Sequence, residues 1–184
     1  SYEACPAYAV PFSFTRGVTQ NAIKVLSNGG GNTNDCNFVE CTVAAGSQNG
    51  HSVAIGETGL NVVQYFKWLG GDIQGSTLHQ EVYLHTEDSL IEGCDIEPPV
   101  GASANYVLTM DACTNTVVKH GSVQGDARLI NGCINSGLEY ITGDGVSISS
   151  DSVSCFLRYH EYRNINLGPL GGYVYDYSNS AELI

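Results

Sequence analysis

The chain has few basic residues and few strong helix formers. Of its 184 residues, seven are Lys or Arg and one is Met, whereas 22 are Gly. Asn, Ser, Thr and Val fill much of the remainder, and this composition favours strands and turns over helices. The 19 acidic residues give a net charge of −12, which argues against binding to nucleic acid or to an anionic membrane surface. The charge is compatible with a neutral or cationic partner.

Several functional motifs are also missing from the sequence. No apolar run approaches the roughly 18 residues of a membrane helix, so we expect no membrane insertion. There is no Cys-x-x-Cys pair, no zinc-type Cys/His spacing and no Gly-x-Ser-x-Gly elbow, so neither a structural metal nor a cofactor is expected. The chain opens with Ser rather than Met and without a signal segment. We therefore expect a processed or trimmed product.

A short two-strand pattern recurs along the chain. In its second strand, an apolar residue stands three positions before a Cys or Gly and another stands two positions after it. Four copies fit this description: Phe38, Cys41, Val43; Trp68, Gly71, Ile73; Ile91, Cys94, Ile96; and Val118, Gly121, Val123. A weaker copy at 130–134 fits only with a slipped register.

The first strand of the pattern recurs at 53–55, 82–84, 107–109 and 138–140, at separations of 29, 25 and 31 residues. Repetition at such a period predicts stacked units, each of which buries its apolar face against its neighbours. An antiparallel sandwich would not require the same residue class at the same offset in each unit.

The seven cysteines cannot all pair within one chain. The repeat predicts that Cys41, Cys94 and Cys133 lie in one inward column as small buried residues. Such thiols favour assembly in a reducing cytosol. A disulfide remains open among the other four: Cys5, Cys36, Cys113 and Cys155.

The segments 37–43 and 89–96 resemble coils of right-handed parallel β-helix proteins, a class that includes pectate-lyase-like polysaccharide enzymes and the trimeric tailspikes of bacteriophages. The resemblance implies an all-β fold, a right-handed parallel β-helix (solenoid) of five or six coils with short capping segments at both ends. We expect a lead-in or capping segment at 1–20, β-helix coils at 21–167, and a Tyr-rich capping strand and tail at 168–184.

The repeat predicts one pair of candidate catalytic carboxylates. Asp72 and Asp95 occupy the same offset on successive coils. Adjacent strands lie about 4.8 Å apart, and glycoside hydrolysis needs two carboxyl groups roughly 5–9 Å apart. The alternative is that both are solvated turn residues. Calcium-assisted elimination is less favoured, because basic residues are few and the candidate bases on the repeats are Lys67, Lys119 and Arg128.

Aromatic side chains are a second group of candidate residues, because their flat rings stack on the apolar faces of sugars. Alternation along the strand places Phe66 and Trp68 on the core side and Tyr65 on the outer side. We therefore predict a glycan-binding set consisting of Tyr65, of Tyr83 in the next coil, and of Glu92.

These observations lead to one functional expectation and two alternatives. We expect a viral, bacteriophage tailspike or fibre-type module that recognises a host surface polysaccharide, with or without cleaving it. The resemblance implies a homotrimer in a virion or outside the cell, assembled in the host cytoplasm. The alternatives are a structural β-helix subunit of a virion or extracellular filament, and a secreted polysaccharide lyase or hydrolase.

Overall fold

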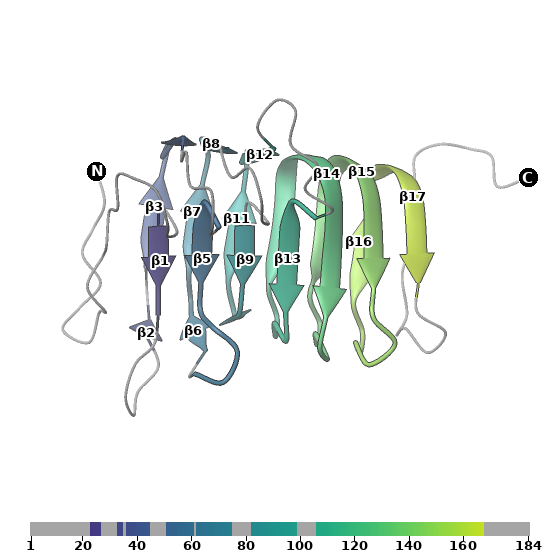
Figure 1. The fold of residues 1–184 in the computed structure, drawn as a ribbon, viewed down its shortest axis with the longest axis horizontal. Helices are drawn as coiled ribbons and strands as arrows, with labels where there is room; N and C mark the ends of the chain where they lie inside the picture. Colours follow the sequence, from purple (N-terminus) through teal and green to yellow (C-terminus); the bar gives the residue numbers. More distant parts are fainter. Residues whose placement is uncertain are drawn as a thin grey trace, which may run out of the picture.

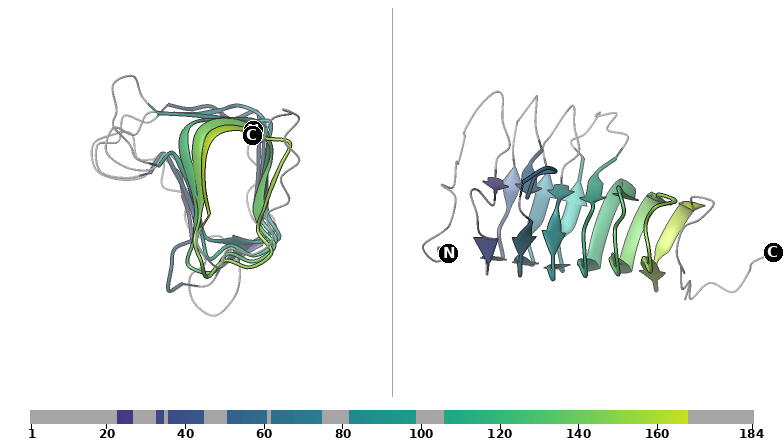
Figure 2. Two further views of the ribbon diagram at one scale, coloured as in Figure 1. Left: turned by 90° about the vertical axis from the view of Figure 1, so that its right-hand side faces the viewer. Right: turned by 90° about the horizontal axis from the view of Figure 1, so that it is seen from below.

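The computed structural model describes residues 23–26, 33–34, 36–44, 51–60, 62–74, 82–98 and 106–167. In these ranges the chain forms strands and turns without any helix (Figure 1). Every pairing between the described strands is parallel. The sheet curls around its core like a half-barrel, as the view along the stack of strands shows (Figure 2, left).

The strands fall into four sets, and within each set the members lie beside one another. The first set is β1 (Ile23–Val25), β5 (Val53–Ile55), β9 (Val82–Leu84) and β13 (Leu108–Asp111). The second is β3 (Asn37–Val39), β7 (Lys67–Leu69) and β11 (Leu90–Glu92), and it continues through the starts of two longer strands to β16 (Phe156–Arg158). The third is β4 (Val43–Ala44), β8 (Asp72–Gln74) and β12 (Asp95–Glu97). The fourth is a separate small sheet of β2 (Thr33–Asn34), β6 (Val63–Gln64) and β10 (Thr86–Glu87).

Three longer strands run through more than one set. They are β14 (Val117–Ile130), β15 (Gly137–Ile148) and β17 (Glu161–Leu167). The start of β14 pairs with β11, its middle with β12 and its end with β13. Each long strand therefore contributes to successive sides of the curled sheet.

The predicted register of the second strand is confirmed. Strand pairing aligns Phe38 with Trp68, Trp68 with Ile91 and Ile91 with Val118. Two positions past the Cys or Gly, it also aligns Val43, Ile73, Ile96 and Val123. We call such a line of equivalent residues a column. A one-residue slip would turn every side chain to the opposite face, so the buried apolar residues hold this register.

The predicted first-strand copies at 107–109 and 138–140 were wrong. Val82 pairs with Leu108 rather than Val107, and Leu138 lies in the column of Val118. The copy at 107–109 is one residue out of register, and the copy at 138–140 was misplaced because the repeat shortens. Pairing partners are 30 positions apart at Ile23 and Val53, but only 19 apart at Leu108 and Ala127 and again at Ala127 and Val146.

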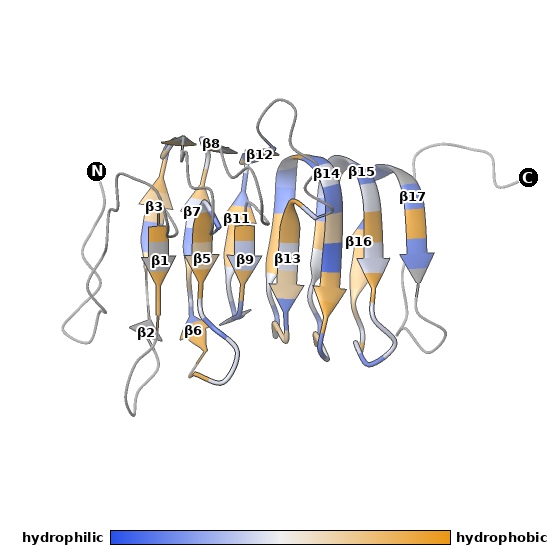
Figure 3. Ribbon diagram, in the orientation of Figure 1, coloured by the Kyte–Doolittle hydropathy of each residue, from blue (hydrophilic) through white to orange (hydrophobic). Residues whose placement is uncertain are grey.

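The core is a continuous stack of inward side chains, which appears as orange bands on the strands in Figure 3. Trp68 is fully buried, as predicted, and its ring stacks on Phe38 at a centroid distance of 4.9 Å. Phe66 is also buried, whereas Tyr65 is 44% exposed. Fully burying one side chain of this size contributes about 1.5–3 kcal/mol.

The cysteines divide between different columns. Cys41 and Cys94 share a column with Gly71 between them, as predicted, since Asp95 pairs with Asp72 and its N–H donates to the Gly71 carbonyl. Cys94 is buried as predicted, whereas Cys41 is only partly buried. Cys133 was predicted in the same column and instead lies beside Cys113, because Ile134 bridges to Thr114. Cys36 is disulfide-bonded, and the other described cysteines are free thiols.

Two predicted features lie outside the described residues, namely the segments at 1–20 and 168–184. A search of the described residues for a helix long and apolar enough to cross a membrane finds none.

Candidate functional site

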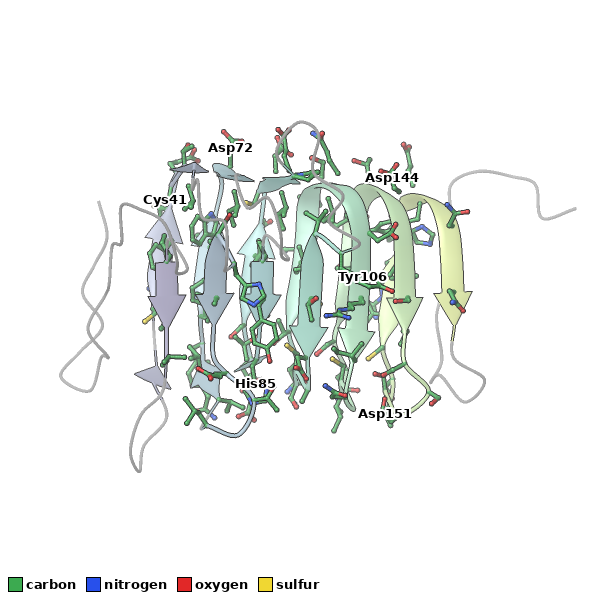
Figure 4. All side chains as sticks on the ribbon, viewed as in Figure 1. Cys41, Asp72, His85, Tyr106, Asp144 and Asp151 are labelled. Carbon is green, nitrogen blue, oxygen red and sulfur yellow. The ribbon has the colours of Figure 1, made fainter. Side chains whose placement is uncertain are left out.

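Asp72 and Asp95 lie side by side on the adjacent strands β8 and β12. Their residues are direct pairing partners, and on the other side Asp95 pairs with Ser122 of β14. The Ser122 hydroxyl donates to Asp95 Oδ1 at 2.8 Å. Asp95 is exposed, Asp72 is half-buried, and Figure 4 shows Asp72 on the outer side of β8. The predicted juxtaposition is confirmed, and the catalytic role stays a prediction.

Further carboxylates surround this pair. Glu97 stands two residues after Asp95 on β12 and accepts a hydrogen bond from Gln124 Nε2. Glu92 forms an ion pair with Lys119 at 3.4 Å, with side chains 37% and 28% exposed, so solvent screens the interaction and it contributes little stability. The surface is thus an acidic one with hydroxyl and amide neighbours.

Cys94 directly precedes Asp95, and its thiol is buried. Burial, followed by the charges of Asp95 and Asp72, raises the pKa of Cys94 to about 12. Since the thiolate is the nucleophilic form, Cys94 is inert at neutral pH. The described residues contain no group of three or more His, Cys, Asp or Glu side chains that could hold a metal ion.

The three predicted glycan-binding residues lie in three different columns. Tyr65 is exposed and has a φ of 56°. Its N–H donates to the carbonyl of Glu87 in the next repeat, so the residue equivalent to Tyr65 there is Asp88 and not Tyr83. Tyr83 lies between Ala54 and Thr109 on β9, and Glu92 is on β11. Tyr65 is exposed, as its outer position predicts, whereas Tyr83 is half-buried; the binding roles of all three residues stay predictions.

Tyr83 belongs to a hydrogen-bonded cluster centred on Asp111, which is only 6% exposed. Tyr83 and Thr58 both donate to Asp111 Oδ2, at 2.7 and 2.9 Å, and Asn131 donates to Oδ1 at 2.8 Å. Because a buried carboxylate must be compensated by donors, these contacts anchor Asp111. The cluster ties four successive repeats together.

Two histidines border the Asp111 cluster. The His51 ring stacks on Tyr83 at 5.2 Å. His85 is buried, and its Nδ1 lies 2.8 Å from the Asp111 carbonyl oxygen. A carbonyl can only accept, so His85 carries a proton on Nδ1. Burial also raises the pKa of Tyr83 to about 12, so its phenol remains a donor at neutral pH. Both carboxylate oxygens of Asp111 accept hydrogen bonds, so the cluster is better suited to joining the repeats than to catalysing a reaction.

An aromatic ladder runs along another corner of the sheet. The rings of His120, Tyr140 and Tyr159 stack at centroid distances of 4.7 and 4.5 Å, with interplanar angles of 11° and 8°. All three are exposed; Tyr140 is 45% and Tyr159 is 43% accessible. The rings therefore form a solvent-exposed stack that offers flat apolar faces.

Comparisons with protein-family models, curated proteins and solved structures found no match. The candidate site is therefore defined by this chain's geometry alone. It consists of the carboxylate surface of β8, β11 and β12 and the adjoining aromatic ladder.

Sequence reasoning missed the ladder and the Asp111 cluster. The ladder had a signal, since Tyr140 follows His120 by 20 positions and Tyr159 follows Tyr140 by 19, close to the repeat in this part of the chain. The Asp111 cluster had none, because Tyr83 comes from a strand whereas Thr58 and Asn131 come from turns, so its members share no repeat offset.

Proposed function

We propose that the chain is a right-handed parallel β-helix module of a bacteriophage tailspike or fibre that binds a polysaccharide of the host surface. Uniformly parallel pairing between repeats 19 to 30 residues apart supports the β-helix. Parallel strands require a crossover connection, and here the chain passes through the other sides of the curled sheet before each return. The trimeric state and the virion location follow from the resemblance of the repeats to tailspike coils.

One observation carries the glycan-binding proposal. The exposed rings of His120, Tyr140 and Tyr159 begin in the repeat of Ser122, which is next to the repeat that carries Asp95. A sugar ring offers an apolar C–H face to an aromatic ring and hydroxyl donors to carboxylates, so adjacent rings and carboxylates match both parts of a saccharide. Equivalent residues recur at a regular spacing from one repeat to the next, and this spacing suits a polymer that runs along the stack.

Cleavage of the bound glycan is a separate question, and it concerns Asp72 and Asp95. The two residues are pairing partners on adjacent strands, which lie about 4.8 Å apart, close to the roughly 5–5.5 Å separation of the two carboxyl groups in retaining glycosidases. The Ser122 hydroxyl donates to Asp95 Oδ1 and holds that carboxylate in place. In such a pair one carboxyl group acts as the acid and the other as the base or nucleophile.

The first experiment measures particle mass by light scattering and then glycan retention on an array. We expect a discrete trimer that retains a bacterial surface polysaccharide. Large polydisperse or filamentous particles that retain no sugar would refute the proposal and favour a structural subunit.

A second measurement asks whether the retained polysaccharide becomes shorter with time. If the pair is catalytic, turnover disappears in Asp72→Asn and in Asp95→Asn while binding persists. The matched control is Ser122→Ala, which removes the neighbour of Asp95 and keeps both carboxylates. Turnover that survives both aspartate substitutions would exclude the pair.

A further inference from the structure

The aromatic ladder occupies one end of a longer column. Backbone hydrogen bonds link each member to the residue preceding the next: the N–H groups of Glu40, Gly70 and Gly93 donate to the carbonyls of Leu69, Glu92 and Lys119 at 2.8 to 2.9 Å. All members have φ between 49° and 75°. We call this line the corner column, and its members are Glu40, Gly70, Gly93, His120, Tyr140 and Tyr159.

The ladder of rings stops at His120 because the next member is Gly93. Gly93 is exposed, and a Cβ built on it would meet nothing closer than Gly70 Cα at 3.8 Å. The space above Gly93 is therefore open to solvent. One face of the His120 ring stacks on Tyr140, and the opposite face borders this space.

The opposite wall of the space is a carboxylate. A Cβ built on Gly70 would lie 2.5 Å from Glu40 Oε1, so the Glu40 side chain covers Gly70. We define the Gly93 slot as the space floored by Gly93 between the His120 ring and the Glu40 carboxylate. Since the rings of the ladder are 4.5–4.7 Å apart, the slot is one repeat wide and accepts one ring.

The flanks of the slot are acidic. Glu92 directly precedes Gly93 and is paired with Lys119, while Asp95 follows Gly93 by two positions. Glu40 is exposed at the end of the slot. Together with the net charge of −12, these carboxylates repel an anionic sugar and attract a cationic one.

We propose that the Gly93 slot binds one ring of an amino-sugar polysaccharide, with the ring stacked on His120 as the next step of the ladder and its ammonium group facing Glu40. This inference rests on the proposed glycan-binding function and names the sugar class and the subsite. The apolar face of the sugar replaces the missing side chain of Gly93. The ammonium gains a charge-assisted hydrogen bond with a carboxylate.

The test fills the slot with a side chain. Gly93→Tyr adds a ring where the sugar would lie, and the left-handed backbone is tolerated because Tyr140 and Tyr159 adopt it in the same column. Gly132→Tyr is the matched control, since Gly132 has φ of 75° and its nearest neighbour to an added Cβ is Asp151 O at 3.8 Å. Light scattering and circular dichroism establish that both variants fold. His120→Ala removes the stacking face without filling the slot.

The probes are tetramers of glucosamine, of N-acetylglucosamine and of galacturonate. We expect the wild-type chain to prefer the glucosamine tetramer, with an affinity that falls as salt rises. Gly93→Tyr and His120→Ala should each weaken binding about tenfold or more, and Gly132→Tyr should leave it unchanged.

The outcomes separate this inference from the proposed function. Equal binding by Gly93→Tyr and Gly132→Tyr would overturn the slot while glycan binding stands. A wild-type preference for N-acetylglucosamine or galacturonate would overturn the amino-sugar assignment. If the wild-type chain retains no sugar on the array or among the tetramers, both proposals fail.

Discussion

Gly71 and Gly59 form a matched pair that tests the stacking of the repeats. Both have a left-handed backbone, with φ of 86° and 87°. A Cβ built on Gly71 would lie 2.1 Å from the carbonyl oxygen of Cys41 in the neighbouring repeat, whereas a Cβ on Gly59 would meet nothing within 4 Å. An alanine at either position therefore carries the same conformational penalty, and only Gly71→Ala also collides with backbone.

The magnitude follows from these two contributions. Left-handed φ costs an alanine about 1–2 kcal/mol at both sites. Relief of the overlap at Gly71 requires β4 and β8 to separate by about 1.4 Å, since ordinary contacts are near 3.5 Å. Overpacking of this kind adds about 1–3 kcal/mol. We therefore expect a loss of about 1–2 kcal/mol for Gly59→Ala and about 2–5 kcal/mol for Gly71→Ala.

Urea unfolding followed by circular dichroism measures both losses. With a denaturant slope of about 2 kcal/mol/M, the midpoint of Gly71→Ala should lie about 0.5–1.5 M below that of Gly59→Ala. Equal midpoints with unchanged slopes would refute the close approach of the Gly71 and Cys41 backbones.

Three further predictions concern buried polar groups. The phenol of Tyr83 should titrate near pH 12 by ultraviolet absorbance and contribute stability below pH 10 that is lost as pH rises through 12, because burial raises its pKa; a phenol that titrates near 10 would contradict its placement. Cys94, with a pKa near 12, should react with iodoacetamide at pH 8 far more slowly than the partly exposed Cys41, and equal rates by mass spectrometry would count against its burial. Ser136→Ala should lower the free energy of unfolding by about 1–3 kcal/mol, because the buried Thr116 N–H loses its acceptor at 3.1 Å; a loss below about 0.5 kcal/mol in urea unfolding would argue against that hydrogen bond.

The register of the second strand was predictable because apolar alternation there is strict. Phe38, Trp68, Ile91 and Val118 are all buried in one column, and each stands three positions before a Cys or Gly. Inward residues of stacked parallel strands must be apolar to share one core, so the pattern persists wherever the chain pairs. The same register placed Asp72 beside Asp95.

The C-terminal repeats were harder to predict because the spacing changes. The 31-residue step from 107 to 138 passed over a whole repeat, in which Ala127 pairs with both Leu108 and Val146. Small Ala127 is a weak apolar signal, and the repeat that contains it carries no long loop to mark it. Cys133 was misplaced for the same reason and lies beside Cys113.

The candidate surface was predictable only where it follows the strands. Asp95 lies on β12, whereas His120 lies at a corner where φ is 54°. Apolar periodicity says little about such corners, because their side chains point outward whichever residue is present. The stacking of the ladder rings was therefore found only in the structure, although the spacing of the three residues was visible in the sequence.

The shortening of the repeat also bears on the order in which the chain folds. Pairing Leu108 with Ala127 closes a loop of 19 residues, whereas pairing Ile23 with Val53 closes one of 30. Loop closure entropy makes the longer step about 0.4 kcal/mol less favourable, and low sequence separation accelerates folding. We therefore expect the C-terminal half to nucleate first and the N-terminal repeats to pair onto it later.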